Sequence, residues 1–152
     1  RGLGDVYKRQ EGWALYAEQL ALEAGLADNP LDELGILQSE LFRAVRLVVD
    51  TGMHYKRWTR EKAMAYMKAK TGMSDTEVRV EIERYIVWPA QALSYKVGMI
   101  KILELRKRAQ DALGEKFNIK DFHSALLDHG SPPLFIVEEK VNEMINNANS
   151  LN

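Results

Sequence analysis

Two glutamates near the start of the chain are the groups most able to do chemistry. They enclose the segment Glu-Gly-Trp-Ala-Leu-Tyr-Ala-Glu, which runs from Glu11 to Glu18. In a helix, residues seven apart lie on one face, so both carboxylates point the same way, two turns apart. The rest of the segment is typical of a protein core. On position alone, the simpler explanation is that Glu11 is a partner of the helix dipole and that Glu18 is half of a salt bridge.

Other reactive groups are sparse. The three histidines, His54, His123 and His129, do not have the spacing of an H-E-x-x-H motif. The chain has no cysteine. This excludes a disulfide, a thiolate zinc site and a cysteine nucleophile within these residues.

The composition indicates a globular protein. Of its 152 residues, 46% are hydrophobic and 28% are charged, with a formal net charge of -1. A near-neutral balance gives no electrostatic reason to expect nucleic acid as a partner. No apolar run approaches the roughly 18 residues that a transmembrane helix needs, so we expect no transmembrane segment here.

The elements that must position these groups are all predicted to be helices. Gly25, Pro89 and Gly114 end helical patterns, and Ser74 with Glu77 forms a capping box. We find no alternating stretch long enough for a strand. The fold class is therefore predicted to be an all-α, multi-helix bundle. The expected helices cover residues 11–24, 31–53, 59–71, 74–88, 91–113, 118–128 and 134–147.

Several ordered blocks resemble the bacterial family called domain of unknown function 885, whose members are zincin-like and mostly helical. Together they span nearly all of residues 11–140, which makes the resemblance specific. Two positions depart from the family pattern: Ala90 stands where glycine is usual, and Ser124 where aspartate is usual. The matching blocks are residues 11–18, 43–54, 58–63, 83–86, 89–98 and 122–134.

The resemblance implies a zinc-dependent metallopeptidase. In such a site an H-E-x-x-H helix supplies two ligands and a general base, and a glutamate from a later helix supplies the third ligand. Glu11 matches that glutamate by its position in the motif. Glu18 is expected to lie behind the ligands and to anchor a histidine. The H-E-x-x-H segment is missing, so this chain is expected to be inactive alone.

Tyr95 is the residue we expect to stabilise the oxyanion of peptide hydrolysis. A tyrosine hydroxyl on a rigid helix suits this role, and Tyr95 follows the break at Pro89. The resemblance supports this, because related helical zinc peptidases use a late tyrosine. Tyr85 is a second candidate for the role. The alternative is that Tyr95 is a core tyrosine with a satisfied hydroxyl.

Four more residues are candidates for the site. His54 is predicted to donate to the substrate or the oxyanion, with Asp50 orienting it. The alternative is that His54 pairs with the C-terminal end of its helix. Arg84 and Gln91 are expected to hold the carboxylate or backbone of a peptide. Arg84 has an alternative partner in Glu81.

Residues 1–10 resemble one reading frame of a sequencing-library adapter. We therefore expect them not to be native, the alternative being a genuine polar N-terminus. Residues 11–152 are then the C-terminal helical part of one larger zincin-like peptidase domain. Its partners would be a peptide substrate and the missing N-terminal part of the same protein.

The sequence leaves two other functions open. One is a helical binding or scaffold domain without catalysis, and the other is a peptidase-like relative that has lost its metal. The presence of a histidine pair upstream would favour the zinc peptidase, and its absence would favour one of these two functions. Since family members often carry export signals, the resemblance also suggests an exported or envelope location for the intact bacterial protein.

Overall fold

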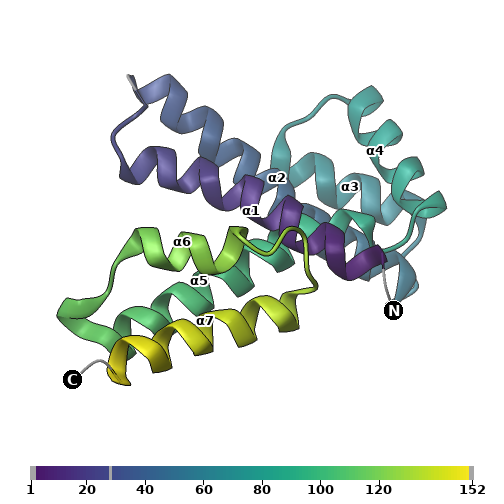
Figure 1. Cartoon of the computed structure of the whole chain (residues 1–152). Coiled ribbons are helices and arrows are strands. Elements are labelled where there is room, and N and C mark those ends of the chain that lie inside the picture. The colour runs from purple at the N-terminus through teal and green to yellow at the C-terminus, as the bar shows by residue number, and fades with distance from the viewer. Residues whose placement is uncertain (1–2, 28, 151–152) are drawn as a thin grey trace.

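The structure, a computed structural model, describes residues 3–27 and 29–150, and within these every regular element is helical. Figure 1 shows the helices in two groups, with α2 to α4 on one side and α5 to α7 on the other. The prediction of an all-α, multi-helix bundle is confirmed. In chain order the elements are α1 (Leu3–Glu23), α2 (Pro30–His54), α3 (Arg60–Thr71), α4 (Asp75–Val87), η1 (Gln91–Leu93), α5 (Ser94–Leu113), η2 (Gly114–Lys116), α6 (Ile119–Leu127) and α7 (Leu134–Ser150).

Most helix boundaries follow local signals in the sequence. Asn29 caps α2, and Ser74 caps α4 in a capping box with Glu77, as predicted. Two boundaries differ from the predictions. Helix α1 begins at Leu3 and not at Glu11, because no proline interrupts the helical spacing of this segment. The helix expected from residue 91 is split into the short 3-10 helix η1 and the α-helix α5. That residues 1–10 are not native stays a prediction.

Two hydrophobic cores hold the helices together. The first lies among α1, α5, α6 and α7 and contains Tyr16, Met99, Ile102 and Phe122. The second lies among α2, α3 and α4 and contains Val49, Met67, Ile82 and Tyr85. None of the described helices is long and apolar enough to cross a membrane.

Helices α1 and α5 cross at two glycines. A Cβ added to Gly12 would lie 2.4 Å from the Cα of Gly98, and one added to Gly98 would lie 2.7 Å from the Cα of Gly12. Real side chains do not tolerate such distances, so only glycine permits this approach. The crossing sets the position of each residue near it, including Glu11 on α1 and Tyr95 on α5.

Candidate functional site

The glycine crossing brings together two of the predicted site residues, Glu11 and Tyr95. Glu11 precedes Gly12, and Tyr95 lies three residues before Gly98, nearly one helical turn. Burial raises the pKa of Tyr95, and hydrogen bonding to Glu11 raises it further. The hydroxyl is protonated at neutral pH, and the effect of Glu11 on the pKa indicates that it donates to the Glu11 carboxylate.

Two arginines of α2 face the ring of Tyr95. The guanidinium carbon of Arg46 is 4.7 Å from the ring centroid, and that of Arg43 is 5.4 Å away. Arg46 is only 4% exposed. The Nε atoms of both arginines are buried and have no hydrogen-bond partner among the described residues. Neither arginine was among the predicted site residues.

The predicted pair Arg84 and Gln91 is also brought together, and Arg46 joins it. The Gln91 side-chain oxygen accepts from Nη1 of Arg84 at 3.0 Å and from Nη2 of Arg46 at 3.2 Å. Arg84 also donates to Glu81 at 2.7 Å. Both of the alternatives for Arg84 are thus present: it contacts Gln91 and it pairs with Glu81.

Tyr85 lies beside this group, but its hydroxyl is engaged. It donates to the carboxylate of Glu81, and the ring lies under the guanidinium groups of Arg84 and Arg46, 4.9 and 5.5 Å from the centroid. Burial, followed by the bond to Glu81, raises the pKa of Tyr85 strongly. The structure does not place this hydroxyl beside Glu11 and Tyr95, and its catalytic role stays a prediction.

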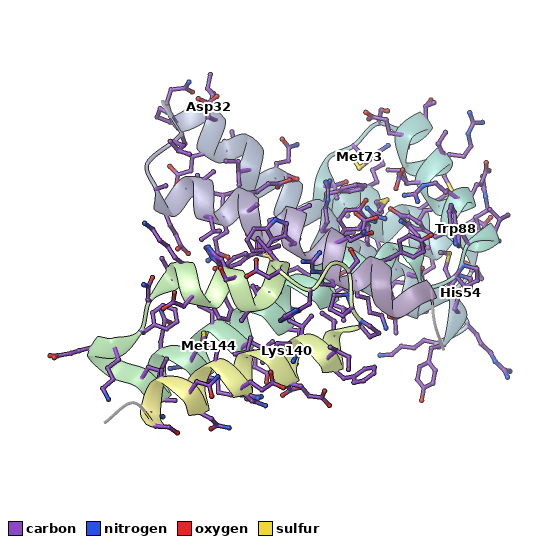
Figure 2. All side chains as sticks on the ribbon, in the orientation of Figure 1. Asp32, His54, Met73, Trp88, Lys140 and Met144 are labelled. Atoms are coloured by element: carbon purple, nitrogen blue, oxygen red, sulfur yellow. The ribbon has the colours of Figure 1, made fainter. Side chains whose placement is uncertain are left out.

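His54 lies away from the Glu11–Tyr95 pair. It is in the last turn of α2, eight residues beyond Arg46, which corresponds to about 12 Å along the helix axis. Its Nε2 atom is 2.9 Å from the backbone carbonyl oxygen of Tyr85. In Figure 2, His54 lies at the edge of the molecule on the side of Trp88 and the end of α4. Its donation to a substrate also stays a prediction.

Asp50 fixes the turn that leads into the site. Its carboxylate is 2% exposed and accepts hydrogen bonds from the backbone N–H of Ala90 at 3.1 and 3.3 Å. Burial raises the pKa of Asp50, and this effect outweighs the Ala90 bond and the charge of His54, which lower it. Among the described contacts, Asp50 accepts hydrogen bonds from Ala90, whereas it interacts with His54 through charge alone.

Glu18 joins α1 to α2. Its carboxylate accepts a hydrogen bond of 3.1 Å from the hydroxyl of Ser39. The single partner leaves carboxylate lone pairs free for a further donor. The predicted role of Glu18 behind a histidine ligand is not tested by this contact.

The residues present fit one ligand of a zinc site. Among residues 3–27 and 29–150, no group of three or more histidines, aspartates or glutamates is placed to hold a metal ion. Glu11 is partly exposed on α1 and offers one carboxylate beside the donor Tyr95. Zinc needs about three protein ligands, so Glu11 can only complete a site whose other ligands lie elsewhere.

Comparison with known proteins identifies the family of the chain and shows its similarity to solved structures. The model of the family described as "Bacterial protein of unknown function (DUF885)" matches residues 4–141. No curated protein matches the chain. The chain is similar to the crystal structure of the "putative lipoprotein from Colwellia psychrerythraea", with 53% identity and a TM-score of 0.90. The similarity covers 93% of this chain and 24% of the other, so the chain spans about a quarter of that protein's length.

Proposed function

The chain belongs to the DUF885 family of bacterial proteins, and we propose that it forms the C-terminal helical part of a zinc-dependent peptidase. The observation that carries the proposal is the pairing of Glu11 with the raised-pKa hydroxyl of Tyr95. A carboxylate that can bind a metal ion then lies next to a protonated hydrogen-bond donor. Hydrolysis of a peptide bond needs both groups at one place.

Glu11 would bind the zinc ion together with a histidine pair from the rest of the protein. When bound, zinc would supply Lewis-acid chemistry and lower the pKa of a water molecule. Glu18, on the same face of α1, would hold one of the histidines through a hydrogen bond. Without the histidine pair, the chain alone would bind zinc weakly and would not cleave peptides.

Tyr95 would donate its hydroxyl proton in a hydrogen bond to the oxygen of the scissile carbonyl as negative charge develops there. Two features of the structure suit this role. The rigid helix α5 fixes the backbone of Tyr95, and the guanidinium groups of Arg43 and Arg46 hold its ring. Gln91 and Arg84 would bind the peptide beyond the scissile bond.

We also propose that the intact protein is exported or attached to the cell envelope. The support is the similarity to a protein that is described as a "putative lipoprotein". The partners of residues 11–152 would be the peptide substrate and the remaining part of the same protein.

The test is the substitution Glu11→Gln in the intact protein, with Glu18→Gln as the matched control on the same helix face. We expect Glu11→Gln to remove most of the bound zinc, measured by elemental analysis, and to abolish peptide hydrolysis. Glu18→Gln should keep measurable zinc and activity. If Glu11→Gln leaves both zinc content and hydrolysis unchanged, the proposal is wrong, and a metal-free relative or a binding domain is the better description.

A further inference from the structure

Three arginines from two helices converge beside Tyr95. Arg43 and Arg46 share the ring of Tyr95, while Arg46 and Arg84 share the side-chain oxygen of Gln91. Arg46 therefore lies between the other two and is almost fully buried. Burial lowers the pKa of Arg46, and the like charge of Arg84 lowers it further.

The carboxylates nearby are engaged by other groups, and Glu11 accepts from the Tyr95 hydroxyl. Glu81 is bound by Arg84 and by the Tyr85 hydroxyl, and Asp50 is bound by the N–H of Ala90. Within the described part of the chain, neither Arg43 nor Arg46 makes a hydrogen bond or salt bridge to a carboxylate. A buried charge without an opposite partner is costly, and each of these arginines keeps a buried Nε–H unsatisfied.

The cluster is open to an outside group at the side chains of Arg43 and Arg84, while Arg46 lies buried behind them. Arg43 borders a groove of about 290 Å³, which is lined by residues of α2 and by Thr71 and Met73. The side chain of Arg84 is 35% exposed, and Gln91 and Tyr95 are partly exposed. Because the Gln91 oxygen already accepts two hydrogen bonds, its NH₂ group is left to donate.

We propose that Arg43, Arg46 and Gln91 form a subsite for the free C-terminal carboxylate of the peptide substrate. Arginine binds carboxylates through paired N–H groups, and Arg43, which borders the groove, can present such a pair to an incoming carboxylate. The bound carboxylate gives Arg43 and Arg46 the directly hydrogen-bonded anionic partner that they lack among the described residues.

The geometry also points to the site of cleavage. This step rests on the proposed function, in which Tyr95 contacts the scissile carbonyl. The guanidinium carbon of Arg46 is 4.7 Å from the centroid of the Tyr95 ring, and one extended residue spans about 3.3–3.6 Å, so a carboxylate held by the arginines lies about one or two residues from the Tyr95 hydroxyl. The peptide bond that is cut is then the last or the second-last one, so the substrates are peptides with a free C-terminus.

The experiment uses the full 152-residue chain with ¹⁵N-labelled arginine and compares N-acetyl-Ala-Ala with N-acetyl-Ala-Ala-amide and acetate. We expect the free acid to shift the Nε–H signals of Arg43 and Arg46 in NMR spectra, and the amide to leave them unchanged. Equal shifts with acid and amide, or no shift with either, would overturn the subsite. Equal affinity for acetate and the peptide acid would overturn its assignment to peptides.

Variants make the assignment specific. Arg43→Gln should weaken binding of the free acid at least tenfold, whereas Arg79→Gln, at an exposed position of α4, should leave it unchanged. Because Arg46 is buried, Arg46→Gln is informative only if its spectrum shows a folded chain; Arg43→Gln keeps the proposal falsifiable. No zinc is involved, so failure here leaves the Glu11 test of the peptidase proposal standing.

Discussion

The carboxylate of Asp50 accepts hydrogen bonds from the backbone N–H of Ala90, 3.1 and 3.3 Å from its two oxygens. These bonds join the end of α2 to the turn that precedes η1. Ala90 has a φ of 69°, in the left-handed region that glycine adopts readily and other residues do not. The turn is therefore strained, and the hydrogen bonds from Ala90 to Asp50 hold it in this conformation. The turn in its place determines where η1 and α5 begin.

Replacing Ala90 by glycine should relieve this strain. The left-handed conformation costs a non-glycine residue about 1–2 kcal/mol, part of which the greater freedom of glycine in the unfolded chain offsets. We expect Ala90→Gly to raise the free energy of unfolding by about 1 kcal/mol in urea denaturation. Gly72→Ala is the matched control: Gly72 has a φ of 70° with no atom near an added Cβ, so alanine there should lower stability by a similar amount. A less stable Ala90→Gly variant would contradict the assigned strain.

Asp50 should also make stability depend on pH. Its pKa in the folded protein lies above the ordinary value of 3.8, chiefly because it is buried. Between 3.8 and the raised pKa, the folded state binds more protons than the unfolded chain, so this contribution to the free energy of unfolding falls as pH rises. It is fully present at lower pH and lost above the folded pKa. We expect the stability difference between the native chain and Asp50→Asn to fall over this range in denaturation experiments. A difference that rises with pH would mean that the Ala90 bonds outweigh burial.

The helices could be predicted because their signals are local. Ser74 and Glu77 lie within one turn, and their capping box depends on no other part of the chain. Glycines at helix ends and Pro89 act over similarly short distances. Ala90 shows the value of the family pattern, since the usual glycine at this position fits the positive φ that the structure has.

The surroundings of the site could not be predicted, because they depend on contacts between distant segments. Arg43 and Arg46 have the composition of an exposed helix face, and only the packing of α2 against Tyr95 buries Arg46. Spacing in the sequence suggested that Asp50 orients His54 one turn away. The structure instead gives Asp50 a backbone partner forty residues further on. The approach of Gly12 to Gly98 likewise has no local signal.

The hydrogen bond between Tyr95 and Glu11 predicts how the tyrosine titrates. Burial raises the pKa of Tyr95 first, and the Glu11 carboxylate raises it further through hydrogen bonding and charge. Glu11→Gln should therefore lower the pKa of Tyr95 toward its ordinary value of 10.0, measured by NMR with ¹³C-labelled tyrosine rings. Glu18→Gln, two turns away and bonded to Ser39, should leave the Tyr95 titration unchanged. An unchanged Tyr95 pKa in Glu11→Gln would show that the two side chains do not interact.

Tyr95→Phe in the intact protein separates the oxyanion role from packing. Loss of one oxyanion donor typically lowers kcat by about 100-fold or more. We expect that fall for Tyr95→Phe with the zinc content unchanged, since Glu11 remains. Tyr85→Phe removes a hydroxyl that donates to Glu81, so it should lower stability while affecting kcat much less. Equal losses of kcat in both variants would argue against a distinct role for Tyr95.

The close crossing of α1 and α5 at Gly12 and Gly98 brings Glu11 and Tyr95 together. A Cβ on Gly12 would lie 2.4 Å from backbone atoms of Gly98, which cannot move aside as a flexible side chain would. Overpacking of this kind costs about 1–3 kcal/mol, which exceeds the roughly 1 kcal/mol that alanine gains over glycine within a helix. Gly12→Ala should therefore lower the free energy of unfolding and weaken the effect of Glu11 on the Tyr95 pKa, because α1 and α5 must separate. Gly35→Ala, inside α2 with no atom within 4 Å of an added Cβ, should instead raise stability by about 1 kcal/mol. If Gly12→Ala were stabilising like Gly35→Ala, the two helices would not approach each other as closely as the structure shows.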